Sequence, residues 1–569
     1  MKPHTNIARL SLWALAALAA AAYLLIIARF GVNIPMDDDY HALQNFLLNF
    51  LKADGAEKLR LMLEAGNMHR LVLMRLVVLG VYAVSGQLNY SAYIWLTSLF
   101  LLAIALLLYR EGAGRSESKS LLAAIIFLLL FNGQNLGNNL WAMSGVANIG
   151  SVMLTLLSIT LILSERRAAF VAGIAVSLLT IYSNGNGMLM IPPLLVCLWM
   201  MKRRRELIAF GLISVTAAAL YFIKLESSRV GGSLTDHPGV KLLNTFAFAG
   251  CNLWIPSAGY IAVAAGAACA AIYLWGIYRG VYKTNLCVYA CLTTLFLTAA
   301  ATAAGNAPVF GGESAAPWRY RIYGSMFLAL TAILVTNNPK AFGTTKLRRI
   351  FPALALAFCI LSTLYCYRKA ERRYEQKVVS SYRWRTAGQG LGLRYPHLEA
   401  HLAAGLSEAE RRGLYRMPHY PLSFLHTPLR DYAGRNFIPF NHGITARLET
   451  RREDRYLVVE GWAYLNEPAA LMEQEDIYIY IIGVGGDEPR LVCRPWFERR
   501  FDVIDDTAKA DCGFLAVIDS AELPSEGYRI EIGLRSRLKP GKPVKIFRPG
   551  DNASKRDCGE NSGANVVRI

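Results

Sequence analysis

Residues 10–41 read LSLWALAALAAAAYLLIIARFGVNIPMDDDYH, and this stretch decides the fold that we expect. The apolar run from Leu10 to Phe30 is long enough to cross a bilayer as a helix. It is also longer than the apolar core of a cleavable signal peptide, so we expect it to remain as the first helix of the chain. Two basic residues precede it, which predicts a cytoplasmic N-terminus.

Three carboxylates, Asp37, Asp38 and Asp39, follow this run at the mouth of the predicted helix. Charges are costly beside a membrane span, and three adjacent carboxylates repel one another. Their repulsion favours the uptake of a proton or a cation, which suits a general base or a cation site. The alternative is a solvated loop whose charges only mark the membrane edge.

The composition predicts a polytopic membrane protein, because 54% of the 569 residues are hydrophobic and only 18% are charged. The net charge of +19 is unevenly distributed. Residues 1–367 hold 28 Lys and Arg against 13 Asp and Glu, whereas residues 368–569 hold 32 against 28. The excess therefore lies between apolar segments, where it sets topology, and we expect no nucleic-acid partner.

Eleven apolar segments are candidate spans, and a twelfth stretch, 71–85, is shorter and holds Arg75. If this stretch does not cross, the loops on the side of the N-terminus carry 17 basic against 4 acidic residues, and the loops on the opposite side up to Tyr367 carry 11 against 9. The positive-inside rule then predicts that the first set is cytoplasmic. In the inner membrane of a bacterium, which we expect, the C-terminal domain would be periplasmic. The segments are 10–30, 91–109, 120–133, 146–164, 168–183, 187–201, 207–223, 259–278, 284–304, 322–337 and 350–367.

This topology places six unusual polar stretches on the periplasmic face. We interpret them as the walls of one outward-facing cavity, although each Asn and Gly alone is also typical of helix caps and turns. Within 132–141, which reads NGQNLGNNLW, we expect Asn138 and Trp141 to line the cavity. The other stretches are 37–39, 66–70, 183–187, 236–237 and 311–321.

After Tyr367 the chain has no further candidate span and is rich in charged residues. We expect a transmembrane domain over 1–370, a periplasmic linker with short helices over 371–445, an all-β sandwich over 446–550 and a flexible tail over 551–569. Cys493 and Cys512 fall on neighbouring predicted strands and could pair in an oxidising compartment.

The layout of the chain resembles the GT-C superfold of integral membrane glycosyltransferases. The shared features are a first helix with an acidic motif at its outer end, a long external loop that closes with His69 and Arg70, many spans and an exported domain. The resemblance implies transfer of a hexosyl or pentosyl group from a polyprenyl-phosphate donor on the outer face of the membrane. The acceptor would be a glycan, a lipid or a protein. The β-sandwich resembles appended carbohydrate-binding modules, which is a likeness of fold alone.

Such a transfer needs a carboxylate to accept the proton of the acceptor hydroxyl, and cationic donors to hold the phosphate leaving group. One of Asp37, Asp38 and Asp39 would be the base. Arg319 and Arg321, with Tyr320 between them, and His69 with Arg70 would hold the phosphate, since guanidinium groups bind phosphate oxygens in pairs. The sequence requires no cofactor, although the acidic triplet could bind a divalent cation.

Other interpretations stay open. Arg319 and Arg321 could anchor the chain at the membrane interface together with Trp318 and Tyr320. The runner-up function is a transporter or flippase for lipid-linked saccharides, for which internal repeats and ionisable residues inside the spans are typical. A membrane scaffold whose β-domain binds a partner is a third possibility.

Overall fold

The computed structural model describes residues 3–66, 69–116, 118–223, 237–254, 259–305, 318–344, 350–388, 390–391, 393, 396–431, 444–465, 475–483, 489–498, 512–536 and 545–547. The chain divides into two compact units. The helical unit comprises Met1–Asn33, Asp38–Ala370 and Gly413–Tyr415. The β unit comprises Ile34–Asp37, Glu371–Arg412 and Arg416–Ile569.

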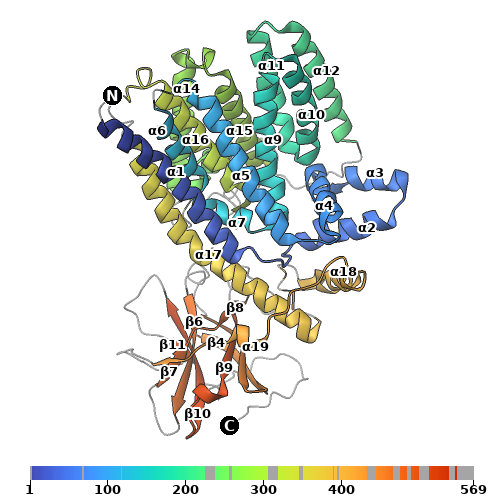
Figure 1. The fold of residues 1–569 in the computed structure, drawn as a ribbon, viewed down its shortest axis with the longest axis vertical. Coiled ribbons are helices and arrows are strands. Elements are labelled where there is room, and N and C mark those ends of the chain that lie inside the picture. The colour runs from blue at the N-terminus through green and yellow to red at the C-terminus, as the bar shows by residue number, and fades with distance from the viewer. Residues whose placement is uncertain are drawn as a thin grey trace. The chain divides into compact units, whose positions relative to one another are not determined.

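The helical unit consists of long helices joined by short helical turns (Figure 1). The predicted eleven segments all fall on helices. The helices are α1 (Pro3–Phe30), α2 (Phe46–Lys52), α3 (Gly55–Leu63), α4 (Val72–Ser85), α5 (Tyr90–Ala113), α6 (Lys119–Leu130), α7 (Leu136–Asn139), α8 (Ala142–Ser144), α9 (Gly150–Ile162), α10 (Arg167–Ser183), α11 (Ile191–Met200), α12 (Arg204–Tyr221), α13 (Pro238–Ala249), α14 (Gly259–Tyr278), α15 (Leu286–Gly305), α16 (Arg321–Asn337) and α17 (Phe351–Ala387).

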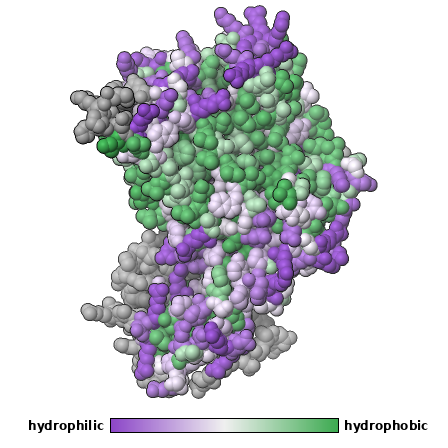
Figure 2. Space-filling view, viewed as in Figure 1, coloured by the Kyte–Doolittle hydropathy of each residue, from purple (hydrophilic) through white to green (hydrophobic). Residues whose placement is uncertain are grey.

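Among the described residues, six helices are long and apolar enough to cross a membrane, or seven if the bent pair formed by α6 and the 133–139 segment is one span. A multi-pass helical chain is therefore supported, but the predicted count of eleven spans is not confirmed. Two of the eleven segments, 168–183 and 187–201, fall on shorter apolar helices, as does the twelfth stretch on α4. Figure 2 shows hydrophobic side chains over the long helices and hydrophilic ones at the tips of α11 and α12.

Hydrogen bonds between loops identify the segments that lie at each of the two ends of the helical unit. At the basic end, Arg203 donates to the carbonyl of Ile162 over 3.1 Å, and Arg115 donates to Asn285 over 3.3 Å. At the other end, which we call the site end, the backbone N–H of Tyr90 donates to Asn33 Oδ1 over 2.7 Å. The end of α1 and the start of α5 thus lie together, so α4 between them does not change sides.

The β unit contains two antiparallel sheets that share one apolar core. Alternating side chains of β5, such as Leu457 and Val459, meet Ile479 of β6 and Ile532 of β10 in this core, which is the packing of a sandwich. One sheet has the order β11-β10-β6-β7-β3 and the other the order β4-β5-β9-β8. The strands are β3 (Arg430–Asp431), β4 (Ile444–Glu453), β5 (Tyr456–Leu465), β6 (Glu475–Gly483), β7 (Leu491–Cys493), β8 (Trp496–Glu498), β9 (Gly513–Asp519), β10 (Tyr528–Ser536) and β11 (Lys545–Phe547).

The segment expected to be a linker contributes to the β unit instead. The second half of α17 packs Val378, Val379 and Tyr382 against the outer face of the β5–β9 sheet. Arg383 fixes this helix through Glu498 of β8, with an Nε–Oε1 distance of 2.6 Å. Cys493, in β7, and Cys512, directly before β9, are both buried and belong to different sheets, and no disulfide joins these two residues.

Glu375 lies beyond the apolar part of α17, buried against the β unit. Phe497 N–H and Arg494 both donate to its carboxylate, each over 3.2 Å. Burial raises the pKa of Glu375 from 4.5 to about 7, although Arg494 opposes the shift. The folded state therefore keeps this proton at pH values where the unfolded chain has released it.

Because this folded-state pKa is raised, stability contributed by Glu375 should be full below about pH 4.5 and should fall by up to about 3 kcal/mol as the pH rises to 7. Thermal unfolding of the full chain between pH 4.5 and 8 measures this loss. Glu375→Gln, which cannot titrate, should show a flatter profile. Parallel profiles for the two proteins would contradict the assignment.

Candidate functional site

Asp39 is a helix cap. It has no exposed surface, and its Oδ1 accepts a hydrogen bond of 2.7 Å from the backbone N–H of Met143. Met143 lies in the first turn of a membrane-length helix, Ala142–Ile162, that runs through α8 and α9. Unsatisfied N–H groups and the helix dipole attract a carboxylate to this position. The third acidic residue of the triplet is thus bound to the start of a span.

Asp38 and Asp37 are placed differently from Asp39. Asp38 is half-buried, and its carbonyl accepts from Ala42 N–H over 2.8 Å at the start of a π-helical turn, Tyr40–Asn45. Asp37 has a positive φ of 46° and belongs to the β unit. Of the three carboxylates, Asp38 is therefore the one that combines partial exposure with a place in the helical unit.

Two π-helical turns flank the contact between Asp39 and Met143. One is Tyr40–Asn45, directly after the triplet, and the other is Gly145–Ile149, directly after α8. Such turns are rare and are found often at functional sites. Tyr90 and Tyr93, both without exposed surface, lie close enough for Asp39 to act electrostatically on their hydroxyls. The triplet therefore continues into a tightly packed polar core.

His69 is exposed at the site end. A two-residue strand pairing sets Gly66 opposite His69, and a Cβ atom added at Gly185 would lie 3.3 Å from His69 Nδ1. Although part of the ring surface is exposed, burial by the surrounding protein lowers the pKa of His69, and the charge of Arg319 lowers it further. From an ordinary value of 6.5, a lowered pKa leaves the imidazole neutral at pH 7.

Arg319 is exposed, and its backbone is held in place by the 138–144 segment. Asn138 donates through Nδ2 to the carbonyl of Arg319 over 3.1 Å and accepts from Ser144 Oγ over 2.8 Å. The guanidinium lies 5.2 Å from the ring centroid of Tyr320. Asn138 has no exposed surface, and its bond to the Arg319 carbonyl positions the Arg319 loop.

Gly137 lets Trp318, which is next to Arg319, pack against the 138–144 segment. A Cβ atom at this position would lie 1.7 Å from Cε3 of Trp318, so only glycine allows the indole to pack there. We expect Gly137→Ala to displace Trp318 and the adjacent Arg319 and to lower the thermal stability of the full chain. Gly80→Ala is the control, because nothing lies within 4 Å of a Cβ atom at Gly80. Equal melting temperatures of Gly137→Ala and Gly80→Ala in thermal unfolding would refute the expectation.

Arg321 and Arg70, which the sequence also marks as phosphate ligands, are both buried and engaged with the protein. Arg321 donates through Nη1 to Gln134 Oε1 over 3.0 Å and to the carbonyl of Cys251. Arg70 donates to the carbonyls of Leu63, Tyr221 and Ile223. These contacts tie loops to helix ends, which is a structural role.

The aromatic members of the predicted site occupy its walls. Trp141 is half-buried, and its Nε1 is buried without a hydrogen-bond partner among the described residues. Tyr320 packs its ring 5.3 Å from that of Phe248 and 6.2 Å from that of Tyr323. His237, the described half of the 236–237 stretch, starts α13, while Asp236 and residues 311–317 lie outside the described residues.

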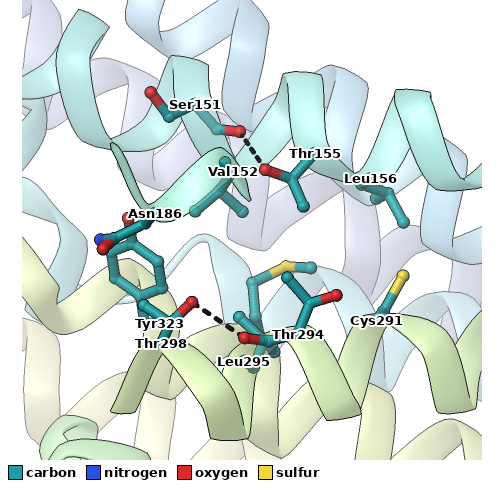
Figure 3. A pocket seen from close by; sticks show the side chains of 12 residues that line it. Ser151, Val152, Thr155, Leu156, Asn186, Cys291, Thr294, Leu295, Thr298 and Tyr323 are labelled. Atoms are coloured by element: carbon teal, nitrogen blue, oxygen red, sulfur yellow. Dashed lines mark hydrogen bonds between the residues drawn. The ribbon is translucent and has the colours of Figure 1, made fainter. Parts of the chain in front are cut away.

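The helical unit also contains a cavity that the sequence did not indicate. It lies between α9 and α15, with Asn186 and Tyr323 at one end (Figure 3). Its signal in the sequence was weak, because single Ser and Thr residues at helical spacing are ordinary in membrane helices. The lining residues are Ser151, Val152, Thr155, Leu156, Asn186, Gly187, Cys291, Thr294, Leu295, Thr298, Tyr323 and Met326.

Within the described part of the chain, no group of three or more His, Cys, Asp or Glu side chains is arranged to hold a metal ion. The site therefore offers a half-buried carboxylate, a neutral imidazole and an exposed guanidinium. No known protein-family model matches this sequence, and no curated protein matches it.

Proposed function

We propose that the helical unit is a glycosyltransferase that moves a sugar from a polyprenyl phosphate to an acceptor hydroxyl at the site end. One observation carries the proposal: the 138–143 segment connects both chemical groups that the reaction needs. Met143 binds the acidic triplet through Asp39, and Asn138 binds the Arg319 loop. Arg319 in turn acts on His69. A base and phosphate-binding groups thus share one end of the unit.

In the proposed step, the oxygen of the acceptor hydroxyl attacks the anomeric carbon of the donor sugar. A new C–O bond forms while the bond between the anomeric carbon and the phosphate oxygen breaks. The electron pair leaves with the polyprenyl phosphate, and the hydroxyl proton passes to the carboxylate of Asp38. A single displacement of this kind inverts the configuration at the anomeric carbon.

Asp38 suits the base better than Asp39. A carboxylate that accepts a hydrogen bond at a helix N-terminus is stabilised in its charged form and is a weaker base. Asp39 also lacks exposed surface, so an acceptor cannot approach it, whereas Asp38 is half-buried.

Arg319 and His69 suit the phosphate. Arg319 is exposed, and an Arg guanidinium can donate two parallel hydrogen bonds to phosphate oxygens. A neutral His69 adds one further N–H donor without needing a counter-charge. As the leaving phosphate gains charge, donors fixed in place stabilise the transition state more than the ground state.

The proposal includes an orientation. The basic end would face the cytoplasm of a bacterium, because its loops carry the excess of Lys and Arg. The site end would then face the periplasm, and the β unit would be exported and bind carbohydrate. The acceptor would be a glycan, a lipid or a protein.

Membranes containing the full chain test the function directly. Polyprenyl-phosphate hexoses and pentoses labelled in the sugar are supplied with a crude envelope acceptor fraction, and label in the acceptor is measured. Transfer that exceeds that of membranes without the protein supports the proposal. Movement of intact donor across sealed vesicles, with no label in any acceptor, would instead show a flippase.

Sidedness is tested separately with His41→Cys and Lys119→Cys, two exposed positions at the site end and the basic end. In a background without accessible native thiols, an impermeant maleimide should label position 41 and not position 119 in cells with a permeabilised outer membrane. Labelling of position 119 alone would invert the proposed orientation.

A further inference from the structure

Two turns of the helical unit are joined at the basic end by Arg203. One turn connects α9 to α10, and the other connects α11 to α12. Arg203, which directly precedes α12, donates through Nη1 to the carbonyls of Ile162 and Ser164 over 3.1 and 2.8 Å. Its guanidinium also lies 5.4 Å from the ring centroid of Phe170, in the first turn of α10. The starts of α10 and α12 therefore lie together at this end.

Exposed cations surround this joint. Arg203 itself is half-buried and pairs with Glu206, with an Nε–Oε1 distance of 3.4 Å, which leaves the other basic side chains to the solvent. Residues 165–167 and 202–206 hold six basic against two acidic residues, a net charge of +4 at neutral pH. The exposed basic residues, which we call the basic cluster, are Arg166, Arg167, Lys202, Arg204 and Arg205.

The helices that carry the basic cluster expose apolar side chains next to it. On α10, Val171 follows Arg167 by four residues, and 60% of its surface is exposed. On α12, Ile208 follows Arg204 by four residues, and 58% of its surface is exposed. Residues four apart share a helix face, so each cation lies about 6 Å along the axis from an exposed apolar side chain. Trp199, at the end of α11, is 72% exposed.

This combination of charge and apolar surface fits an acidic phospholipid. Clusters of about four to eight Lys and Arg beside a span attract acidic head groups, and guanidinium groups donate paired hydrogen bonds to phosphate oxygens. The first turns of α10 and α12 add the positive ends of two helix dipoles. A nucleic acid or an acidic protein would match the charge but would make no use of the apolar side chains. Figure 2 shows the hydrophilic tip of α11 and α12 adjoining the hydrophobic surface of the long helices.

We propose that the basic cluster binds an acidic phospholipid, with its phosphate among the cations and its acyl chains along Val171, Trp199 and Ile208. The site is preformed, because Arg203 joins the two turns through protein carbonyls and does not need the lipid. The inference goes beyond the proposed function and does not depend on it, since lipid binding at the basic end would stand in a protein that transfers no sugar.

The test measures binding of phosphatidylglycerol with a fluorescent acyl chain to the full chain in neutral detergent micelles. Unlabelled phosphatidylglycerol should displace the probe and phosphatidylcholine should not, and about 1 M salt should weaken binding because the cations are exposed. Arg204→Gln combined with Arg205→Gln should weaken binding about tenfold or more.

The matched control is Lys119→Gln combined with Arg279→Gln. It removes the same charge from exposed positions of the α5–α6 and α14–α15 turns, which the bond between Arg115 and Asn285 places at the same end. Its affinity for phosphatidylglycerol should change less than about twofold, because both charges lie in other turns. An equal loss in the two double variants would mean that the charge of the whole end attracts lipid, and would overturn the site.

Trp199→Gln tests the apolar part of the site. It should weaken phosphatidylglycerol binding about threefold without changing its dependence on salt, because it removes apolar contact and no charge. Equal displacement of the probe by phosphatidylcholine would overturn the acidic head group, and equal displacement by inorganic phosphate would overturn the lipid. If the Arg204 and Arg205 double variant does not fold, Arg166→Gln combined with Arg167→Gln replaces it, and unchanged binding by that variant would overturn the site.

Discussion

Asp38→Asn should lower the turnover of sugar transfer by a factor of about 10²–10⁴ while leaving folding and donor binding unchanged. The amide has nearly the shape of the carboxylate but cannot accept the proton of the attacking hydroxyl. The loss should therefore appear in kcat and not in KM for the donor, because the phosphate is held elsewhere, by Arg319 and His69. Single-turnover transfer with saturating donor measures it.

Asp39→Asn is the matched control, one residue away and with the same change of charge. Its amide oxygen can still accept the bond from Met143 N–H, so turnover should fall far less than in Asp38→Asn. Asp39→Ala removes that acceptor and should instead cost about 1–3 kcal/mol of stability, because a buried N–H loses its partner. If Asp39→Asn is the variant that loses turnover, Asp39 is the base and our assignment is wrong.

The three aspartates show what the sequence can and cannot predict. Hydropathy placed the triplet at the end of the first helix, and this placement depends only on local composition. The difference between Asp38 and Asp39 depends on Met143, which is more than 100 residues away and supplies the helix N-terminus that Asp39 caps. No local pattern contains that information, because all three positions have the same side chain.

The NGQNLGNNLW stretch, which the sequence predicts to be a cavity wall, joins helices through its asparagine side chains. Asn135 donates to Ser325 Oγ over 2.9 Å, and Asn139 donates to Ser98 Oγ over 2.9 Å, each joining two helices. Asn138 holds the Arg319 loop in the same way. Amides buried among helices must find partners, so a cluster of Asn in a membrane protein is equally consistent with interhelical bonding.

The cavity between α9 and α15 could not be predicted from the sequence for a related reason. Its hydroxyl-bearing lining residues lie inside apolar helices, where hydropathy averages them away. Whether two such helices pack tightly or leave a gap depends on the side chains of both, and on the turn at Gly185 that enters between them. Helix existence was therefore predictable, whereas the space between helices was not.

We expect the second large effect from substitutions of Arg319, in the Trp318–Tyr320 turn, and Arg321, at the start of α16. Arg321→Ala should cost about 1–3 kcal/mol and lower the accumulation of folded protein, because it leaves the buried carbonyl of Cys251 without its donor and removes the bond to the half-buried Gln134 amide. Arg319→Ala should change stability by less than about 0.5 kcal/mol, since its side chain is exposed. It should nevertheless reduce transfer about a hundredfold or more by removing a donor to the leaving phosphate.

Arg-to-Lys changes at both positions separate charge from geometry. Arg319→Lys keeps a cation near the phosphate and should recover part of the transfer activity. Both bonds of Arg321 are made by Nη1, and a lysine side chain is one bond shorter, so Arg321→Lys should recover little stability. Thermal unfolding and transfer rates of the four variants in nanodiscs decide between the roles. A stable Arg321→Ala protein without transfer would contradict the structural role of Arg321. It would show that Arg321, like Arg319, acts on the donor.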